Sequence, residues 1–184
     1  MTPEQLEQVW RRARCLYDRD AVEAALDRMA EEIRAAVATR NPILCCIMHG
    51  GLIVSGALAV RLPFPLQMDY LHATRYREKT SGSDLHWLTR PTRSLADRVV
   101  VLVDDVLDEG HTLAQVRAYC LEQRCAQVYR AVLVEKKSRH REAAVTADFV
   151  GLTAEDYYLF GYGMDYQGYL RNAPGIYAID DADR

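Results

Sequence analysis

Four acidic residues stand within six positions in the segment Asp104-Asp105-Val106-Leu107-Asp108-Glu109. Clustered like charges cost stability, and a bound cation or a polyhydroxylated anion relieves that cost. The next residues are Gly110, which permits a tight turn, His111, and Thr112, which offers a hydroxyl at the start of a predicted helix. The free N–H groups of a helix start favour an anion. We therefore interpret residues 104–112 as a ligand site; the alternative is that the acids only complement a helix dipole.

The residues on either side predict the elements that position this site. Val99–Val103 is an unbroken, mostly β-branched apolar run, which is typical of a strand buried on both faces and ending at the acids. Leu113, Val116 and Cys120 repeat at helical spacing and predict a helix from about Thr112 to Gln123. In open α/β sheets, ligands bind where a strand's carboxyl end meets the next helix.

A second strand, turn and helix precede this unit. Ile43–Met48 is a continuous apolar run, His49-Gly50-Gly51 follows it, and Leu52–Leu62 is helix-like. The glycine pair permits close approach of the backbone to a phosphate, although an ordinary glycine connection has the same pattern. Two helices are predicted before this unit, one opened by the capping box at residues 2–5 and ending before residue 18, and one from about residue 20 to Val37.

Two polar features lie on either side of the acidic segment. After a predicted strand over Leu66–Tyr70, the segment Ala73–Asp84 is too charged for a core element and predicts a mobile lid, or alternatively a surface hairpin. The chain has three lysines and twenty arginines, and two of the lysines, Lys136 and Lys137, follow a strand predicted over Val128–Val134. An ammonium is a compact donor that suits a single ligand oxygen, although two solvated surface lysines are the simpler interpretation.

Composition predicts one α/β domain that acts on small molecules. The 184 residues are 49% hydrophobic and 27% charged, enough for one full core. The net charge of -3 gives no general field for nucleic acid or an anionic membrane. The residues contain no targeting pattern and no span-length apolar run, so we expect a cytoplasmic protein. The five cysteines lack zinc spacing and are expected to be free, buried thiols.

The segment from Val99 to Leu113 resembles the signature of type I phosphoribosyltransferases: a hydrophobic strand, two acids, two apolar residues, Asp, a variable residue, Gly, a variable residue and Thr. The later order of features resembles hypoxanthine-guanine phosphoribosyltransferases, over about residues 40 to 180. Those features are the lysine-containing strand end, Asp148-Phe149-Val150-Gly151, Asp156-Tyr157, Gly161-Tyr162-Gly163 and Asp165-Tyr166.

The resemblance implies an α/β type I phosphoribosyltransferase fold, with a mostly parallel central sheet flanked by helices. It implies a single domain over residues 1–184, with N-terminal helices at 1–40, a flexible lid loop at 75–86, and a small purine-binding hood with the C-terminal segment at 135–184. The implied reaction transfers the phosphoribosyl group of phosphoribosyl pyrophosphate to hypoxanthine or guanine, giving IMP or GMP and pyrophosphate. The implied cofactor is Mg²⁺, and the implied assembly is a homodimer or homotetramer.

The resemblance also implies a role for each site residue, with Asp108 as the general acid or base near purine N7. The phosphoribosyl group and its 5′-phosphate would be bound by Asp104, Asp105, Asp108, Glu109, Gly110, His111 and Thr112. Pyrophosphate would be bound by His49, Gly50, Arg75, Tyr76 and Arg171, with an unusual peptide geometry before Gly50. The purine would be bound by Lys136 through its exocyclic oxygen, Tyr158 by stacking, Leu159 through its main chain, and Asp165. Mg²⁺ would be held by Asp104, Asp105 and Asp165.

Other functions keep the same central motif. An enzyme for xanthine, adenine or a pyrimidine is the nearest alternative. A regulator that senses phosphoribosyl pyrophosphate would add a basic nucleic-acid surface or a second domain. A structural protein with a decayed site would have lost some of its acids, whereas Asp104, Asp105, Asp108 and Asp165 are all present.

Overall fold

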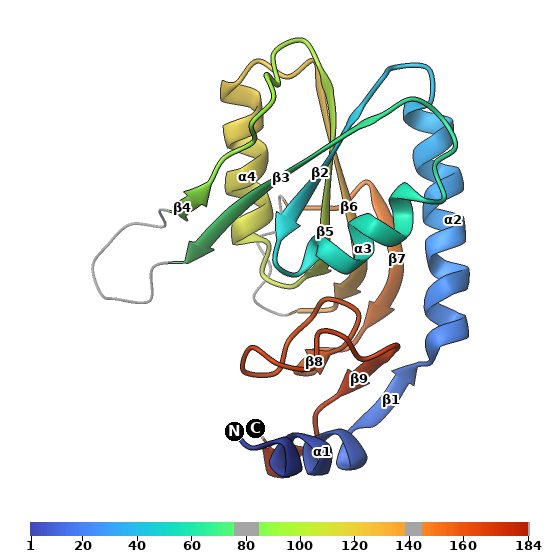
Figure 1. The fold of residues 1–184 in the computed structure, drawn as a ribbon, viewed down its shortest axis with the longest axis vertical. Coiled ribbons are helices and arrows are strands. Elements are labelled where there is room, and N and C mark those ends of the chain that lie inside the picture. The colour runs from blue at the N-terminus through green and yellow to red at the C-terminus, as the bar shows by residue number, and fades with distance from the viewer. Residues whose placement is uncertain (76–84, 139–144, 184) are drawn as a thin grey trace.

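A six-stranded sheet forms the centre of the computed structural model, which describes residues 1–75, 85–138 and 145–183 (Figure 1). Its strand order is β4-β3-β2-β5-β6-β7, and each pair is parallel except β3 with β4. The sheet is therefore mostly parallel, as predicted. The strands are β2 Ile43–Met48, β3 Gln67–Arg75, β4 Leu85–Thr89, β5 Val99–Leu107, β6 Gln127–Lys136 and β7 Phe149–Ala154.

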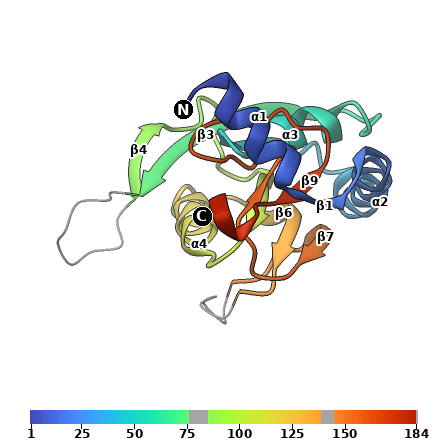
Figure 2. The same ribbon diagram turned by 90° about the horizontal axis from the view of Figure 1, so that it is seen from below.

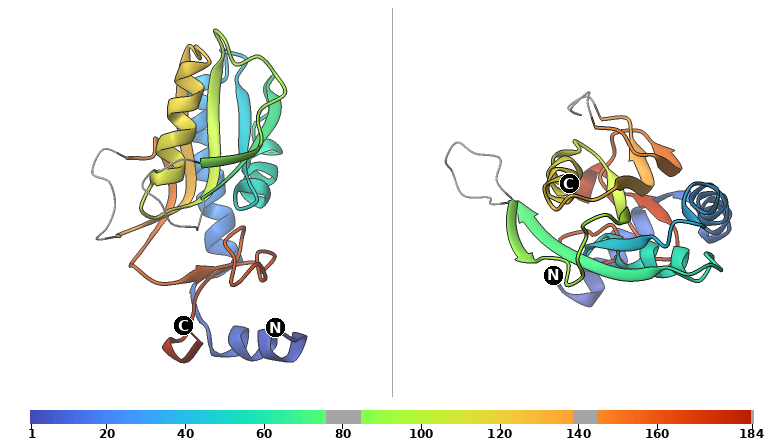
Figure 3. Two further views of the ribbon diagram at one scale, coloured as in Figure 1. Left: turned by 90° about the vertical axis from the view of Figure 1, so that its left-hand side faces the viewer. Right: turned by 90° about the horizontal axis from the view of Figure 1, so that it is seen from above.

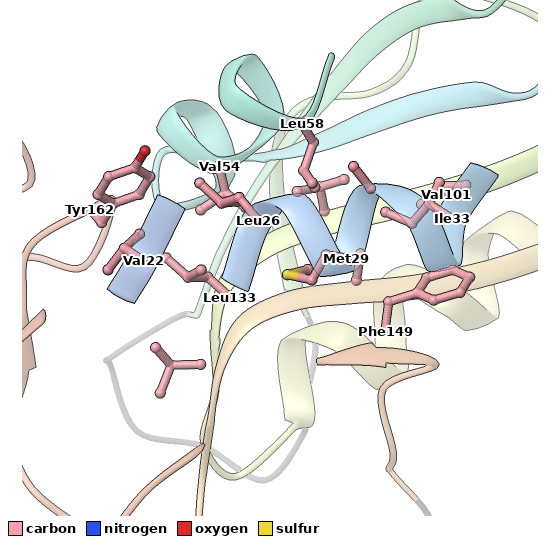
Figure 4. Packing of buried hydrophobic residues seen from close by; sticks show 14 of the residues in the cluster. Val22, Leu26, Met29, Ile33, Val54, Leu58, Val101, Leu133, Phe149 and Tyr162 are labelled. Carbon is pink, nitrogen blue, oxygen red and sulfur yellow. The ribbon is translucent and has the colours of Figure 1, made fainter. Parts of the chain in front are cut away.

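Helices cover both faces of the sheet. Helices α2 (Arg19–Val37) and α3 (Gly51–Ala59) lie on one face, and α4 (His111–Glu122) lies on the other. Side chains alternate along β5, so Val101 packs toward α2 while Val100 and Leu102 pack toward α4. Figure 4 shows the stripe of α2 against α3 and the sheet. These apolar stripes are what the sequence pattern predicted.

A smaller antiparallel sheet of order β1-β9-β8 forms a hood below the carboxyl ends of the main strands (Figure 3). Helix α1 packs under this sheet, and Figure 2 shows it in front when the molecule is seen from below. The hood joins both ends of the chain, since Arg12 pairs with Asp183 at 2.9 Å. Its elements are α1 Pro3–Arg12, β1 Arg14–Tyr17, β8 Leu159–Phe160, β9 Ile176–Ala178 and the short 3₁₀ helix Asp181–Asp183.

The first helix ends before Asp18, as predicted, at Arg12, and it is followed by β1, which pairs with β9 and was not predicted. Two expectations from the sequence are corrected by the fold. The strand β5 does not end at the acids but continues through Asp104 and Asp105, because its pairing with β6 extends to Leu107. The thiols are free, but they are not all buried: Cys15 is exposed on the hood, and Cys125 is half-buried.

Strands β3 and β4 extend into the predicted lid from both sides. Arg75 is the last residue of β3, and residues 85 and 86 begin β4, which pairs with β3. The rest of the predicted lid, residues 76–84 with Tyr76, lies outside the described residues. The hood predicted from residue 135 starts later as a sheet, because β6 and β7 belong to the main sheet. Among the described helices, none has the length and apolar character of a bilayer span.

Candidate active site

A cavity of about 650 Å³ lies at the carboxyl ends of β2, β5 and β6, between the main sheet and the hood. It brings together most of the residues predicted from the sequence. The predicted residues that line it are His49, Gly50, Asp104, Asp105, Asp108, Glu109, Gly110, Thr112, Lys136, Tyr158, Leu159, Asp165 and Arg171.

Three predicted residues stand apart from this lining. His111 begins α4 beside the cavity, with its Nε2 3.7 Å from the Glu109 carboxylate. Arg75 is placed only by its backbone, at the end of β3. Tyr76 lies outside the described residues. The structure therefore leaves the predicted pyrophosphate contacts of Arg75 and Tyr76 untested.

The turn into α4 requires a glycine and lines the cavity. Gly110 is the N-cap of α4 with φ +90°, a left-handed conformation that glycine adopts without strain. A side chain there would also meet Val145, on the far side of the turn. The first turn of α4 brings Thr112 and Leu113 to the cavity wall. The first N–H groups of a helix have no partner within the helix, so with the helix dipole they make this end of the cavity suited to a phosphate.

Asp104 and Asp105 form the floor of the cavity beside the two glycine turns. A Cβ on Gly50 would overlap the carboxylate of Asp105, and one on Gly163 of the hood would overlap the Gly50 carbonyl. Burial raises the pKa of both acids, and the neighbouring charge of Asp105 raises that of Asp104 further. The Asp105 carboxylate accepts a hydrogen bond from the Val106 N–H at 2.7 Å. The two glycines therefore allow β5, the turn after β2 and the hood to pack closely around Asp104 and Asp105, whose charged forms are destabilised by burial.

His49 occupies the turn after β2, and its peptide bond with Met48 is cis. This is the unusual peptide geometry that the resemblance implied. The His49 ring meets the His72 ring of β3 edge-on, with centroids 4.4 Å apart. Burial lowers the pKa of His72, and the charge of His49 lowers it further. His49 thus lines the cavity while its ring is supported by the neighbouring strand.

Lys136 is the buried cation of the cavity and lies between two carboxylates. Its Nζ is 2.7 Å from Oδ2 of Asp108 and 2.9 Å from Oδ1 of Asp156. Burial by itself lowers the pKa of Lys136, but the hydrogen bonds to the two acids raise it overall, so the group stays an ammonium. Asp156 had no predicted role. The sequence signals for Asp156 were its place in the Asp156-Tyr157 pair of the resemblance and its position two residues before Tyr158.

One wall of the cavity is formed by β8 and by Tyr158, the residue before it. The Ile179 N–H donates to the Tyr158 carbonyl at 3.0 Å, so Leu159 and Ala178 are a non-hydrogen-bonded pair. The N–H and C=O of Leu159 are thus directed away from β9, toward the open edge of β8. The Tyr158 ring is half-exposed and packs edge-on against Tyr166. Both features fit the predicted binding of a flat purine base, by hydrogen bonds at the ring edge and by stacking on the ring face.

The loop of residues 161–171 in the hood, the hood loop, holds a further ionic pair of the cavity. Arg171 forms an ion pair with Asp165, with a nitrogen-to-oxygen distance of 2.6 Å, and donates a hydrogen bond to the Gly163 carbonyl at 2.6 Å. Asp165 also accepts from the Gly168 N–H at 2.7 Å. The guanidinium lies 4.0 Å from Asp105, which brings the hood loop to the floor of the cavity. Asp165 and Arg171, two predicted site residues that the structure shows as an ion pair, therefore lie beside Asp104 and Asp105.

Tyr162 anchors this loop to the main body, a role that the sequence did not indicate. Its hydroxyl donates to Glu23 of α2 at 2.8 Å, and Glu23 also pairs with Arg61 beyond α3. Burial and the bond to Glu23 raise the pKa of Tyr162 to about 12, while the same hydrogen bond, with that from Arg61, lowers the pKa of Glu23. Glu23, Arg61 and Tyr162 lie far apart in the chain, so no short sequence pattern could have predicted this contact.

Comparison with known proteins agrees with this geometry. Residues 14–167 match the phosphoribosyl transferase domain family. The chain is 26% identical over 163 residues to a hypoxanthine-guanine-xanthine phosphoribosyltransferase of Tritrichomonas foetus, covering 89% of each chain. It is 26% identical over 174 residues to a hypoxanthine-guanine phosphoribosyltransferase of Aquifex aeolicus, covering 93% of this chain and 97% of that protein.

Solved structures share the fold. The chain is similar to a hypoxanthine-guanine-xanthine phosphoribosyltransferase structure with a TM-score of 0.83 and 24% identity, covering 91% of this chain and 97% of that one. It is also similar to a hypoxanthine phosphoribosyltransferase of Staphylococcus aureus, with a TM-score of 0.85, 20% identity and 92% of each chain covered. The predicted type I fold is thereby confirmed. Because the family match spans most of the sequence and includes the acidic segment and the glycine turn of the cavity, the chain belongs to the phosphoribosyltransferase family.

Proposed function

We propose that the protein transfers the 5-phosphoribosyl group of phosphoribosyl pyrophosphate to hypoxanthine or guanine, giving IMP or GMP and pyrophosphate. The observation that carries this proposal is a single cavity with a phosphate-type helix start at one end and Lys136 beside Asp108 at the other. The curated relatives named for 6-oxopurines support the choice of base. In this proposal the enzyme salvages free purine bases.

The cavity divides into sites for the parts of the cosubstrate. The start of α4 binds the 5′-phosphate through backbone N–H groups and Thr112. Asp104 and Asp105 accept hydrogen bonds from the ribose hydroxyls, which compensate their burial. The main chain at His49 and Gly50, with Arg171 from the hood, binds the pyrophosphate. These contacts hold the anomeric carbon toward the base.

The base is bound and deprotonated from the opposite side. Lys136 donates to the C6 oxygen, the main chain of Leu159 reads the ring edge, and Tyr158 covers the ring face. Oδ2 of Asp108 is 2.7 Å from Nζ of Lys136, which supports a position of Asp108 beside N7 when Lys136 binds the C6 oxygen. There the Asp108 carboxylate takes the proton from N7, while the attacking ring nitrogen bonds to the anomeric carbon and the bond from that carbon to pyrophosphate breaks. Because the sugar passes through an oxocarbenium-like state, positioning and charge placement dominate catalysis.

The donor set at the floor of the cavity fits Mg²⁺. This ion prefers oxygen ligands and is usually bound through one or two carboxylates together with substrate oxygens. Asp104, Asp105 and Asp165 would hold it with the cosubstrate, since the described residues contain no group of three or more His, Cys, Asp or Glu side chains placed to hold a metal by themselves. Burial disfavours the charged form of both acids, and a bound cation would compensate that charge. When bound, Mg²⁺ neutralises charge on the leaving pyrophosphate.

A turnover assay with four bases tests the proposed function. Hypoxanthine, guanine, xanthine and adenine are each offered with phosphoribosyl pyrophosphate and Mg²⁺, and the nucleotide product is measured. We expect rapid formation of IMP and GMP, loss of activity with a chelator, and recovery on adding Mg²⁺. Product from adenine alone would contradict the proposal, and product from none of the four bases would favour a sensing function.

We further propose that two copies associate through α3 and β3. Helix α3 has no charged residue and is apolar on all sides, a composition typical of a helix that is buried all round. Yet Leu52 and Val60 on its outer side are exposed, as are Met68 and Tyr70 of β3. Since Leu71 packs toward α4, its alternating neighbours Met68 and Tyr70 face the same side of the sheet as α3. A second copy would cover this surface.

Sedimentation velocity tests the dimer. We expect the protein to sediment at twice its chain mass of 20.9 kDa, and Val60→Glu to shift it to the single-chain mass because the charge cannot be buried in an apolar contact. Leu121→Glu is the matched control, because Leu121 is exposed on α4, across the sheet. A monomeric wild-type protein would contradict this assembly.

A further inference from the structure

We propose that Asp156 is a positioning residue for base recognition, which holds the ammonium of Lys136 toward the base and away from Asp108. This inference rests on the proposed function, in which Lys136 meets the C6 oxygen. Asp108 and Asp156 reach Lys136 from different elements, the loop after β5 and the segment between β7 and β8. All three side chains line the cavity.

The need for Asp156 follows from what the base requires of Asp108 and Lys136. The proposed reaction uses Asp108 at N7 and Lys136 at the C6 oxygen, yet the two groups are already joined at 2.7 Å. If Asp108 were the only acid near Lys136, the ion pair between the two groups would compete with their contacts to the base. An ammonium donates in three directions, so a second carboxylate can keep it charged while Asp108 turns to the base. Asp156, 2.9 Å away, is that second carboxylate.

The accessibility of the three groups supports this division of roles. The Lys136 side chain is 10% exposed, whereas Asp108 and Asp156 are 42% and 47% exposed. The cation is thus the buried partner, and losing a carboxylate beside it leaves charge uncompensated in a place that solvent reaches poorly. Replacing half-exposed Asp156 leaves the hydrophobic core untouched.

The neighbouring residues provide a matched control. Lys137 pairs with Glu155 at 2.7 Å, one position along each segment from the pair of Lys136 and Asp156. These side chains are 65% and 59% exposed, and neither residue lines the cavity. Solvent screens such a pair, so its loss has little effect. Two adjacent ion pairs of the same type therefore differ mainly in whether they reach the site.

The first experiment measures the kinetics of Asp156→Asn, which keeps the shape and removes the charge. We expect kcat/KM for hypoxanthine to fall by roughly 10- to 100-fold, the effect of losing one charge-assisted hydrogen bond, with KM for phosphoribosyl pyrophosphate unchanged. Glu155→Gln is expected to match the wild-type protein in both constants. Unchanged or improved use of hypoxanthine by Asp156→Asn would overturn the inference.

A double-mutant cycle with Lys136→Met decides whether Asp156 acts through Lys136. If it does, Asp156→Asn has no further effect on kcat/KM for hypoxanthine when Lys136 is already methionine. A full additional loss, or a rise in KM for the cosubstrate, means a general structural role and overturns the inference. A harmless Lys136→Met overturns the proposed base site and this inference together, whereas a damaging Lys136→Met beside a harmless Asp156→Asn overturns the inference alone.

Discussion

Asp108→Asn is expected to lower kcat by roughly 10²- to 10⁴-fold, the range typical for loss of a general acid or base. The asparagine side chain keeps the shape of the acid but cannot take up a proton. In the cavity Asp108 contacts Lys136 and follows β5 directly, so its carboxylate lies between the predicted base and ribose sites. Because Asp104 and Asp105 still hold the sugar, KM for phosphoribosyl pyrophosphate is expected to change much less.

Steady-state kinetics with hypoxanthine as the varied base measure this effect. Asp27→Asn provides the control, because it removes an exposed carboxylate of α2 that pairs with Arg61 outside the cavity. Thermal unfolding of both variants shows whether either change acts through stability. Wild-type turnover in Asp108→Asn would end the assignment of Asp108 as the proton-transfer group.

The second large effect concerns the choice of base and rests on Lys136. An ammonium has donors and no acceptor, so it pairs with the C6 oxygen of hypoxanthine or guanine but meets only donors on the amino group of adenine. A buried site built around such a hydrogen bond leaves polar groups unpaired when the wrong base binds. We expect kcat/KM for adenine to be at least roughly 10²-fold below that for hypoxanthine in the unmodified protein.

Lys136→Met is expected to lower kcat/KM for both 6-oxopurines by roughly 10- to 100-fold or more, because the charged donor is lost and two acids remain without their cation. Lys137→Met is expected to be mild, since Lys137 pairs with Glu155 at the exposed surface. Catalytic efficiencies for hypoxanthine, guanine and adenine in the three proteins test both statements. Comparable use of adenine by the unmodified protein, or an unaffected Lys136→Met, would contradict the role of Lys136.

Much of the central fold was predictable because its signals are local. The apolar runs at Ile43–Met48 and Val99–Val103 became neighbouring strands β2 and β5, since a strand buried on both faces needs apolar side chains on each. The stripe from Val22 to Val37 became the face of α2 that packs on the sheet. The position of Gly110 also followed from the sequence, because glycine suits the left-handed turn before α4.

The elements that were missed depend on partners far along the chain. Residues 14–17 have little strand pattern of their own and form β1 because β9, from the other end of the chain, lies beside them. The hydrogen bond between Tyr162 and Glu23 joins residues 139 positions apart, and neither residue type predicts its partner from the sequence. Cys15 was predicted to be buried, but it is exposed because β1 lies at the edge of the hood sheet.

The sequence by itself determined the chemistry of the parts: acids after an apolar run, a glycine turn into a helix, and a lysine at a strand end. Those assignments need only residue types and short spacings, because each is decided within one strand, turn or helix. The tertiary structure alone decided which parts meet. It placed Asp156 beside Lys136 and Gly163 against Gly50, since the hood folds back over the strand ends and packing brings distant segments together.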